Sequence, residues 1–397
     1  MTRVERILES VLERGLQRRS PGAVPAFAPG RVERILVLNK HNIGDVLCTT
    51  PALRALRRAF PKAFLAILVS EHCRPVLERN PDLDEIFTYT KSKHRADWLG
   101  LPAQWDLWDV IRRLRARRFD LAVSMGRPSS RSGGWLAYAC GAPWRLGYVG
   151  PRLHPFGFFL NLGRDPGPIT SHEVDGSLEL LASIGVPPAG RELTLAPDPE
   201  AQATIRRRLR EAGCPADARP ALVHISNRRE SSRWPLTSFA QAADFLRERL
   251  GLTALLSWAP GDASNPLFPG DDGKAEAVAR QMRTRPILLP TPTLSELIAA
   301  MSLSDLILST DGGPMHLAAA LDVPQVVLFG KTGQAHWAPI SEKCAILQRG
   351  QRVDGIAVEE VEMAASGVMA RWGRRAGASA RRRNRSRTET AGRDGGP

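Results

Sequence analysis

Short apolar runs alternate with amphipathic segments along most of the chain. Continuous apolar runs are typical of strands buried on both faces of a parallel sheet, and apolar positions three or four residues apart are typical of helices packed on that sheet. This alternation predicts an α/β fold with right-handed crossovers. Strands are expected at 35–38, 64–69, 85–89, 119–124, 145–148, 221–225, 253–258, 287–289, 306–309 and 325–330. Helices are expected at 46–56, 73–79, 105–117, 135–140, 237–250, 274–283, 294–301 and 314–321.

The alternation occurs twice, and a proline-rich stretch at 187–199 separates the two runs. We therefore predict two Rossmann-like, doubly wound domains, at 31–190 and 191–369. An N-terminal helix and linker, 1–30, is expected before them, and a basic tail, 370–397, after them. Ligands of doubly wound sheets bind outside the carboxyl ends of the strands, so the two domains are expected to face one cleft.

Two of the predicted strand-to-helix corners combine glycine with polar residues. The strand 35–38 leads through Asn39-Lys40-His41-Asn42-Ile43-Gly44-Asp45 into a helix. The strand 306–309 leads through Thr310-Asp311-Gly312-Gly313-Pro314 into a helix that contains His316. Such a corner points free backbone N–H groups and the positive end of the helix dipole at its ligand, and thus suits a phosphate or diphosphate.

These corners resemble the signature segments of glycosyltransferase family 9, the heptosyltransferases. The resemblance is carried by Ile43-Gly44-Asp45-Val46-Leu47, Thr50-Pro51-Ala52-Leu53 and Asp311-Gly312-Gly313-Pro314-Met315-His316-Leu317-Ala318-Ala319-Ala320, and it extends from about Arg34 to about Met369. It implies the glycosyltransferase B fold, with the acceptor bound by the first domain and the donor by the second. It further implies an inverting, metal-independent enzyme that moves heptose from ADP-heptose to a lipopolysaccharide core or related glycan.

The first corner supplies the candidate catalytic residue. The resemblance implies that Asp45 is the general base that takes the proton of the acceptor hydroxyl. The alternative is a helix N-cap, a common reason for aspartate at a helix start. Lys40 and His41 could lower the pKa of Asp45 or contact an anionic acceptor. Arg127 and Arg131 are further candidates for acceptor binding.

The second corner supplies the candidate donor site. Asp311, Gly312, Gly313 and His316 match the donor site of the family position by position. Two plainer readings stay open: His316 as a core histidine bonded to a carbonyl, and Asp311 as a helix N-cap.

The loop after strand 221–225 is expected to complete the donor site. Its Arg233-Trp234-Pro235 matches the family pattern, in which a lysine usually precedes this triplet, but Ser232 stands here. A neutral hydroxyl cannot replace a cation beside a leaving diphosphate. Arginine binds phosphate in a bidentate manner, so Arg228, Arg229 or Arg233 could take over. Ser226 and Asn227 are expected phosphate or ribose contacts.

Composition indicates the cellular compartment of the protein and the character of its C-terminal segment. No apolar run approaches the ~18–20 residues that span a bilayer, and charges near the N-terminus replace the apolar core of a signal peptide. Five scattered cysteines fit reduced thiols, so we expect a cytoplasmic protein. Half of the net charge of +14 lies between Arg371 and Pro397. This tail is either a solvated extension or an attachment to the anionic inner face of the inner membrane; it lacks interleaved aromatics, which makes a nucleic-acid partner unlikely.

No metal and no cofactor are expected, because the nucleoside-diphosphate sugar is a substrate and the cationic loop with the helix dipole can do the work of a metal. Asp82-Leu83-Asp84 matches a metal-binding DxD motif, but it follows Asn80-Pro81 and precedes a strand, which favours a surface turn. Two alternatives to a transferase remain open: a nucleotide-sugar epimerase on the same fold, and a catalytically degenerate nucleotide-sugar binding protein.

Overall fold

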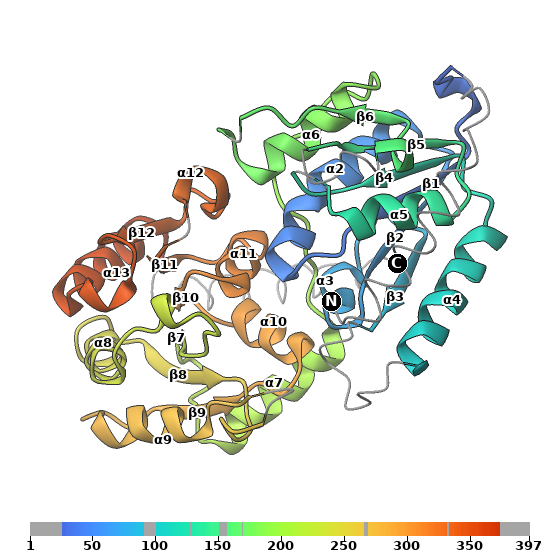
Figure 1. Ribbon diagram of the computed structural model, residues 1–397. Coiled ribbons are helices and arrows are strands. Elements are labelled where there is room, and N and C mark those ends of the chain that lie inside the picture. The colour runs from blue at the N-terminus through green and yellow to red at the C-terminus, as the bar shows by residue number, and fades with distance from the viewer. Residues whose placement is uncertain are drawn as a thin grey trace, which may run out of the picture.

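The computed structural model describes residues 26–90, 101–127, 129–150, 157–168, 170–265, 269–331 and 333–373. Within them, two six-stranded sheets form the two halves of the molecule (Figure 1). The predicted N-terminal helix and almost all of the basic tail lie outside the described residues.

The first sheet has the order β3-β2-β1-β4-β5-β6, and every neighbouring pair is parallel. Its central strand is apolar throughout its interior, and Leu36 is in register with Ala66 on one side and Ala122 on the other. Burial on both faces explains why the strand reads as an uninterrupted apolar run. The strands are β1 Arg34–Leu38, β2 Phe64–Ser70, β3 Glu85–Tyr89, β4 Leu121–Ser124, β5 Trp144–Tyr148 and β6 Leu162–Arg164.

The second sheet repeats this design in the order β12-β11-β10-β7-β8-β9, again with parallel neighbours only. Numbered from its own first strand, this is the order 3-2-1-4-5-6 of a classic dinucleotide-binding sheet. The strands are β7 Pro220–His224, β8 Thr253–Trp258, β9 Ile287–Pro290, β10 Leu306–Thr310, β11 Gln325–Phe329 and β12 Cys344–Gln348.

Helices cover both faces of the sheets, as crossover connections require. Those of the first half are α2 Ile43–Ala59, α3 Arg74–Leu77, α4 Leu101–Ala116, α5 Arg131–Ala139 and α6 Glu173–Ala182. Those that follow are α7 Pro199–Glu211, α8 Leu236–Glu248, α9 Asp272–Gln281, α10 Leu294–Ser302, α11 Gly313–Ala320, α12 Gln334–Trp337 and α13 Val358–Trp372. Short 3₁₀ turns lie at Pro29–Arg31, Glu71–Cys73, Gly157–Phe159, Glu230–Ser232 and Val353–Gly355.

The predicted α/β fold and all ten predicted strands are confirmed, with ends that differ by at most two residues. The sequence pattern did not reveal β6, β12, α6, α7, α12 or α13. Strand β6 is only three residues long and partly exposed, and β12 is partly exposed along its whole length. Neither therefore carries the apolar run by which the other strands were found.

The halves share one apolar core. Leu47 and Leu53 of α2 belong to the same buried cluster as Ile298 of α10 and Leu317 of α11. Figure 1 shows α10 and α11 of the second half between its sheet and the first half, with α11 facing α2. Among the described helices, none is long and apolar enough to cross a membrane.

Candidate functional site

Each sheet has one place where its connections reverse direction. In the first sheet this lies between β1 and β4, and in the second between β7 and β10. At such a switch point the loops after the two strands lead away to opposite sides and leave a crevice at the carboxyl ends. The predicted site residues follow these four strands: Lys40, His41 and Asp45 after β1; Arg127 and Arg131 after β4; Ser226, Asn227, Arg229 and Arg233 after β7; and Asp311, Gly312, Gly313 and His316 after β10.

Asp45 lies in the first turn of α2 but is not its N-cap. Asn42 is the N-cap, and its backbone N–H donates to Oδ2 of Asp45 over 3.1 Å. This is one arm of a capping box, which fixes the carboxylate at the crevice. Burial raises the pKa of Asp45 and the nearby Glu173 adds to the increase, whereas His41 and the Asn42 N–H oppose it. A desolvated carboxylate of this kind has an increased affinity for a proton.

Lys40 and His41 are partly exposed beside Asp45. The Lys40 ammonium lies over the Tyr89 ring, 5.2 Å from its centroid, and the Tyr89 hydroxyl donates to the Lys40 carbonyl. His41 packs against Gly126, where a methyl group would lie 2.6 Å from Nε2 of the ring. Gly126 has a φ of 104°, so glycine is required there both for the backbone and for the histidine.

Arg127 is turned into the protein. Its side chain is 4% exposed, and its guanidinium donates to Ser171 Oγ, contacts Glu179 and lies over the Tyr148 ring. The predicted role in acceptor binding therefore competes with contacts that already occupy this guanidinium. The side chain of Arg131 lies outside the described residues.

The loop after β7 crosses the end of β10. The Asn227 amide donates to Thr310 Oγ1 and to the Asp311 carbonyl, and its oxygen accepts the Arg229 N–H. The Ser226 hydroxyl accepts the Ala259 N–H from the loop after β8. Both predicted contact residues thus shape the loop, because their polar groups tie it to the neighbouring strand ends.

Two of the three candidate arginines are also engaged. Arg229 is largely exposed and lies 3.6 Å from the carboxylate of Asp311, which is buried. Arg233 donates to the carbonyls of Asn227 and Arg228 within its own loop. Ser232 is 1% exposed and its hydroxyl has no hydrogen-bond partner. A lysine at position 232 would have to be buried, so this packing does not suit the lysine that usually stands there in the family.

The two corners meet each other directly. The ring of His316 is buried against Gly44 of α2, where a methyl group would lie 2.7 Å from Cδ2. Gly313 faces Ile43 in the same way, and a methyl group there would lie 3.3 Å from the Ile43 Cβ. Burial, with a smaller effect of His172, lowers the pKa of His316 to about 3, so this imidazole is neutral. The helix that Asp311 precedes has Gly312 as its N-cap, which removes the N-cap reading of Asp311.

Glu173, His172 and His336 also lie in this region; the sequence pointed only to His336, which follows a strand end and is therefore a candidate for the donor pocket. His336 Nε2 lies 3.2 Å from Glu173 Oε2, and the His172 imidazole accepts the Val174 N–H at the start of α6. A usable signal was present, because His172-Glu173 precedes apolar residues at helical spacing, Val174, Leu178 and Leu181.

The predicted turn at Asp82-Leu83-Asp84 is confirmed, and Trp234 of the family motif is a packing residue. The Asp84 carboxylate accepts the Leu65 N–H and pairs with Arg57, so the Asp82-Leu83-Asp84 segment is a structural turn. Trp234 is buried with its ring edge on Phe239. Among the described residues, no group of three histidine, cysteine or acidic side chains is placed to hold a metal ion.

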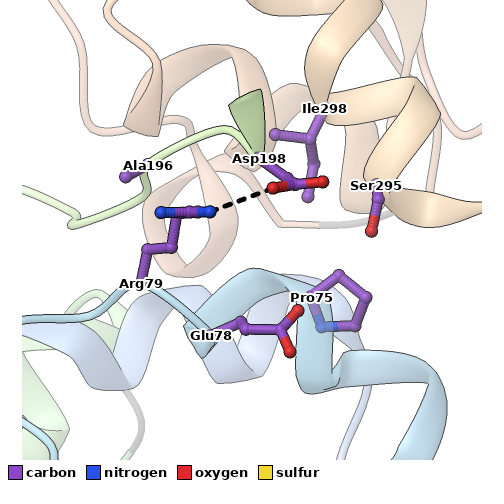
Figure 2. Close-up of a pocket in the computed structure, with 7 residues that line it drawn as sticks. All are labelled: Pro75, Glu78, Arg79, Ala196, Asp198, Ser295 and Ile298. Carbon is purple, nitrogen blue, oxygen red and sulfur yellow. Dashed lines mark hydrogen bonds and ion pairs between the residues drawn. The ribbon is translucent and has the colours of Figure 1, made fainter. Parts of the chain in front are cut away.

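A separate small pocket lies between α3, α10 and the segment before α7 (Figure 2). Arg79 and Asp198 form an ion pair of 3.1 Å at its edge. None of the predicted site residues lines it, and its walls come from both halves of the molecule.

Comparisons with known proteins agree with this arrangement. Residues 107–363 match the model of glycosyltransferase family 9 (heptosyltransferase). Lipopolysaccharide heptosyltransferase 3 of Escherichia coli is 24% identical over 318 residues, which cover 75% of this chain and 84% of the relative.

Two solved structures share the fold. The family 9 glycosyl transferase of Veillonella parvula DSM 2008 has a TM-score of 0.74 and 24% identity, over 85% of this chain and 97% of that one. The ADP-heptose lps heptosyltransferase II of E. coli has a TM-score of 0.68 and 19% identity, over 85% and 99%. The match to the family model covers more than half of the chain, which therefore belongs to glycosyltransferase family 9 and is a glycosyltransferase of the B fold.

Proposed function

We propose that this glycosyltransferase moves heptose from ADP-heptose to a lipopolysaccharide core or related glycan, with inversion at the anomeric carbon and without a metal ion. The observation that carries the proposal is the meeting of the two corners, since Gly44 beside Asp45 lies against His316 of α11. The first turn of α2, which carries Asp45, thereby lies against the first turns of α11, and this supports the pairing of a base from one half with a helix N-terminus from the other. The names of the relatives in E. coli, which mention lipopolysaccharide and ADP-heptose, support the choice of acceptor and donor.

The reaction needs a base on one side of the sugar and charge stabilisation on the other. Asp45 takes the proton of the acceptor hydroxyl, and the hydroxyl oxygen forms a bond to the anomeric carbon. The bond from that carbon to the diphosphate breaks at the same time, and its electron pair leaves with ADP. Because the incoming and leaving oxygens lie on opposite faces, the configuration inverts.

Donor binding is assigned to the edge of the second sheet. The backbone N–H groups at the start of α11 and the helix dipole favour a diphosphate. Arg228 is exposed in the loop after β7, next to Arg229, and guanidinium groups there can neutralise the charge that develops on the leaving group. These groups would make a metal ion unnecessary.

The first test replaces Asp45 with asparagine. The amide keeps the size of the side chain but cannot accept a proton, so we expect kcat with ADP-heptose and a heptose-deficient lipopolysaccharide to fall more than tenfold, while the Kd for ADP stays unchanged. The exposed Asp217 gives a control, since Asp217→Asn makes the same chemical change at a surface position. Retention of more than about a tenth of the wild-type rate, a barrier change under ~1.4 kcal/mol, would rule out Asp45 as the base.

Product analysis separates the proposal from its alternatives. A transferase forms ADP and a heptosylated acceptor only when both substrates are present. An altered sugar nucleotide formed from the donor alone would identify an epimerase, and binding of ADP-heptose without either product would identify a binding protein.

A further inference from the structure

Two histidines connect the halves next to Asp45. His172, the N-cap of α6, has its Nε2 2.9 Å from the carbonyl of Ala338. His336 of α12 has its Nδ1 3.0 Å from the carbonyl of Ser171 and its Nε2 3.2 Å from Oε2 of Glu173. The contacts thus run in both directions, with each half supplying one imidazole.

The partners fix the protonation of both rings. Nδ1 of His172 accepts the Val174 N–H, so its single proton is on Nε2 and donates to Ala338. Both nitrogens of His336 face acceptors, a carbonyl and a carboxylate, and a neutral imidazole could donate to only one of them. The hydrogen bonds of His336 are complete only in the imidazolium form, while His172 is neutral.

The surroundings shift the pKa values of the two rings in opposite directions. A hydrogen bond to Glu173 raises the pKa of His336, while Arg127 and partial burial oppose the increase. Burial lowers the pKa of His172. The charged groups that face this contact are Arg127 from the loop after β4 and Glu173 from α6, and Glu173 acts in turn on Asp45 of α2.

The contact of His172 and His336 with the opposite halves, here called the bridge, is packed against the corner that carries Asp45. The ring of His336 meets Trp337 edge to face at 4.8 Å between centroids, and Trp337 meets His316 at 6.2 Å. His316 in turn lies on Gly44, one residue before Asp45. Glu173 is 7% exposed and is close enough to act on the charge of Asp45, which is partly buried. A buried carboxylate without a partner is costly, so Glu173 needs the cation that the other half brings.

We propose that Glu173 and His336 are positioning residues for the transfer reaction, whose ion pair docks the second half onto the first and balances the charge beside Asp45 only when the two corners are in contact. This inference rests on the proposed function, because it assigns the pair to the step in which Asp45 acts as base. Through this ion pair, the charge state and position of the base Asp45 depend on where the donor half is placed. Neither residue touches the reacting atoms.

The ionisation of His336 and of Asp45 should determine how kcat depends on pH. The pKa of His336 is raised, so the ion pair is complete below the ordinary value of 6.5 and is lost as the pH rises through the raised pKa. The pKa of Asp45 is also raised, so the base becomes ionised only as the pH rises above its ordinary range. We therefore expect kcat to rise with Asp45 ionisation and to fall with His336 deprotonation.

The test compares His336→Gln, Glu173→Gln and the double variant with wild type. His336→Gln should lower kcat about tenfold or more through misplacement and should remove the alkaline limb. Glu173→Gln should move the acidic limb to lower pH, because the charge of Glu173 raises the pKa of Asp45, and should remove the alkaline limb, because no ion pair is left to be lost. The double variant should lose no more than the worse single variant, since both substitutions break one pair.

Arg79→Gln is the matched control, because it breaks another ion pair between the first half and the segment that enters the second, away from Asp45. Arg79→Gln should lower the melting temperature and leave kcat and both limbs of the pH profile unchanged. The same result in the His336 and Glu173 variants would overturn the inference, because their ion pair would then be a structural contact only.

NMR titration of the His336 ring measures its pKa, and thus the ion pair with Glu173, without any substrate. A midpoint above 6.5 that falls in Glu173→Gln supports the pair, and a midpoint at or below 6.5 overturns it whatever the activity. A protein that is inactive with every donor but shows the raised midpoint would refute the proposed function and not the bridge.

Discussion

At the scale of single residues, the corners explain why glycine occupies position 44. Glycine beside a candidate base suggests close approach of a ligand, but the ring of His316 lies there instead. The same contact explains why His316 is buried and neutral. Local sequence revealed both residues as unusual and could not reveal that they touch, because 272 positions separate them and no local periodicity encodes a contact between halves.

Substitution of Gly44 should therefore act through stability. In Gly44→Ala the new methyl group would lie 2.7 Å from the His316 ring, which has no room to retreat because it is buried. We expect a loss of about 1–3 kcal/mol in the free energy of unfolding, measured by urea denaturation. Gly273 has no atom within 4 Å of an added methyl group, so Gly273→Ala in α9 should be neutral or slightly stabilising. Equal stability of the two variants would contradict the contact with His316.

At the scale of elements, α2 continues through a proline. Pro51 has no N–H to give to the carbonyl of Leu47, and the Thr50 hydroxyl donates to that carbonyl over 2.7 Å instead. The Thr50 oxygen also accepts the Thr194 N–H from the segment between the halves. One buried hydroxyl therefore repairs the helix and anchors the connecting segment, which explains why Thr50-Pro51 occurs inside a helix and not at its end.

Removal of this hydroxyl should destabilise the protein without a change of volume. Thr50→Val keeps the shape of the side chain but leaves the Leu47 carbonyl and the Thr194 N–H unsatisfied in the interior. We expect a cost of about 1–3 kcal/mol in thermal or chemical unfolding. Thr50→Ser keeps the hydroxyl and should retain most of the stability. If serine were as harmful as valine, the effect would come from the methyl group and not from the two hydrogen bonds.

The elements themselves were largely predictable, because most strands are buried on both faces and leave continuous apolar runs. Helix α6 was missed, and with it Glu173, since its polar start was not separated from the surrounding loop. The functions of Ser226 and Asn227 were harder to judge for a different reason. A polar side chain after a strand suits a ligand and a loop bond equally well, and only the structure shows that these side chains bond to Ala259 and Thr310.

At the scale of the molecule, two copies of one architecture place their switch points against each other. The strand orders are equivalent, so the same edge of each sheet carries the polar loops. At this contact each half supplies one glycine and one larger residue, because Gly44 of α2 meets His316 of α11 and Gly313 of α11 meets Ile43 of α2. The sequence indicated a cleft between two domains, and the structure adds that the two corners touch each other. Any change in the spacing of α2 and α11 must then alter the position of Asp45 relative to the donor half.

Gly313 provides the clearest test of this contact. From sequence, Gly313→Val is expected to crowd the donor; from the structure, the valine meets Ile43, whose Cβ lies 3.3 Å from an added methyl group. We expect Gly313→Val to lower the melting temperature and the affinity for ADP together, and Ile43→Ala to restore much of both in the double variant. The backbone cost of a branched residue before Pro314 is common to both backgrounds, so the double-mutant cycle isolates the side-chain contact. Additive effects, with ADP affinity still lost in the double variant, would show that the valine acts on the donor, and that the glycine serves ligand approach and not the junction of the two halves.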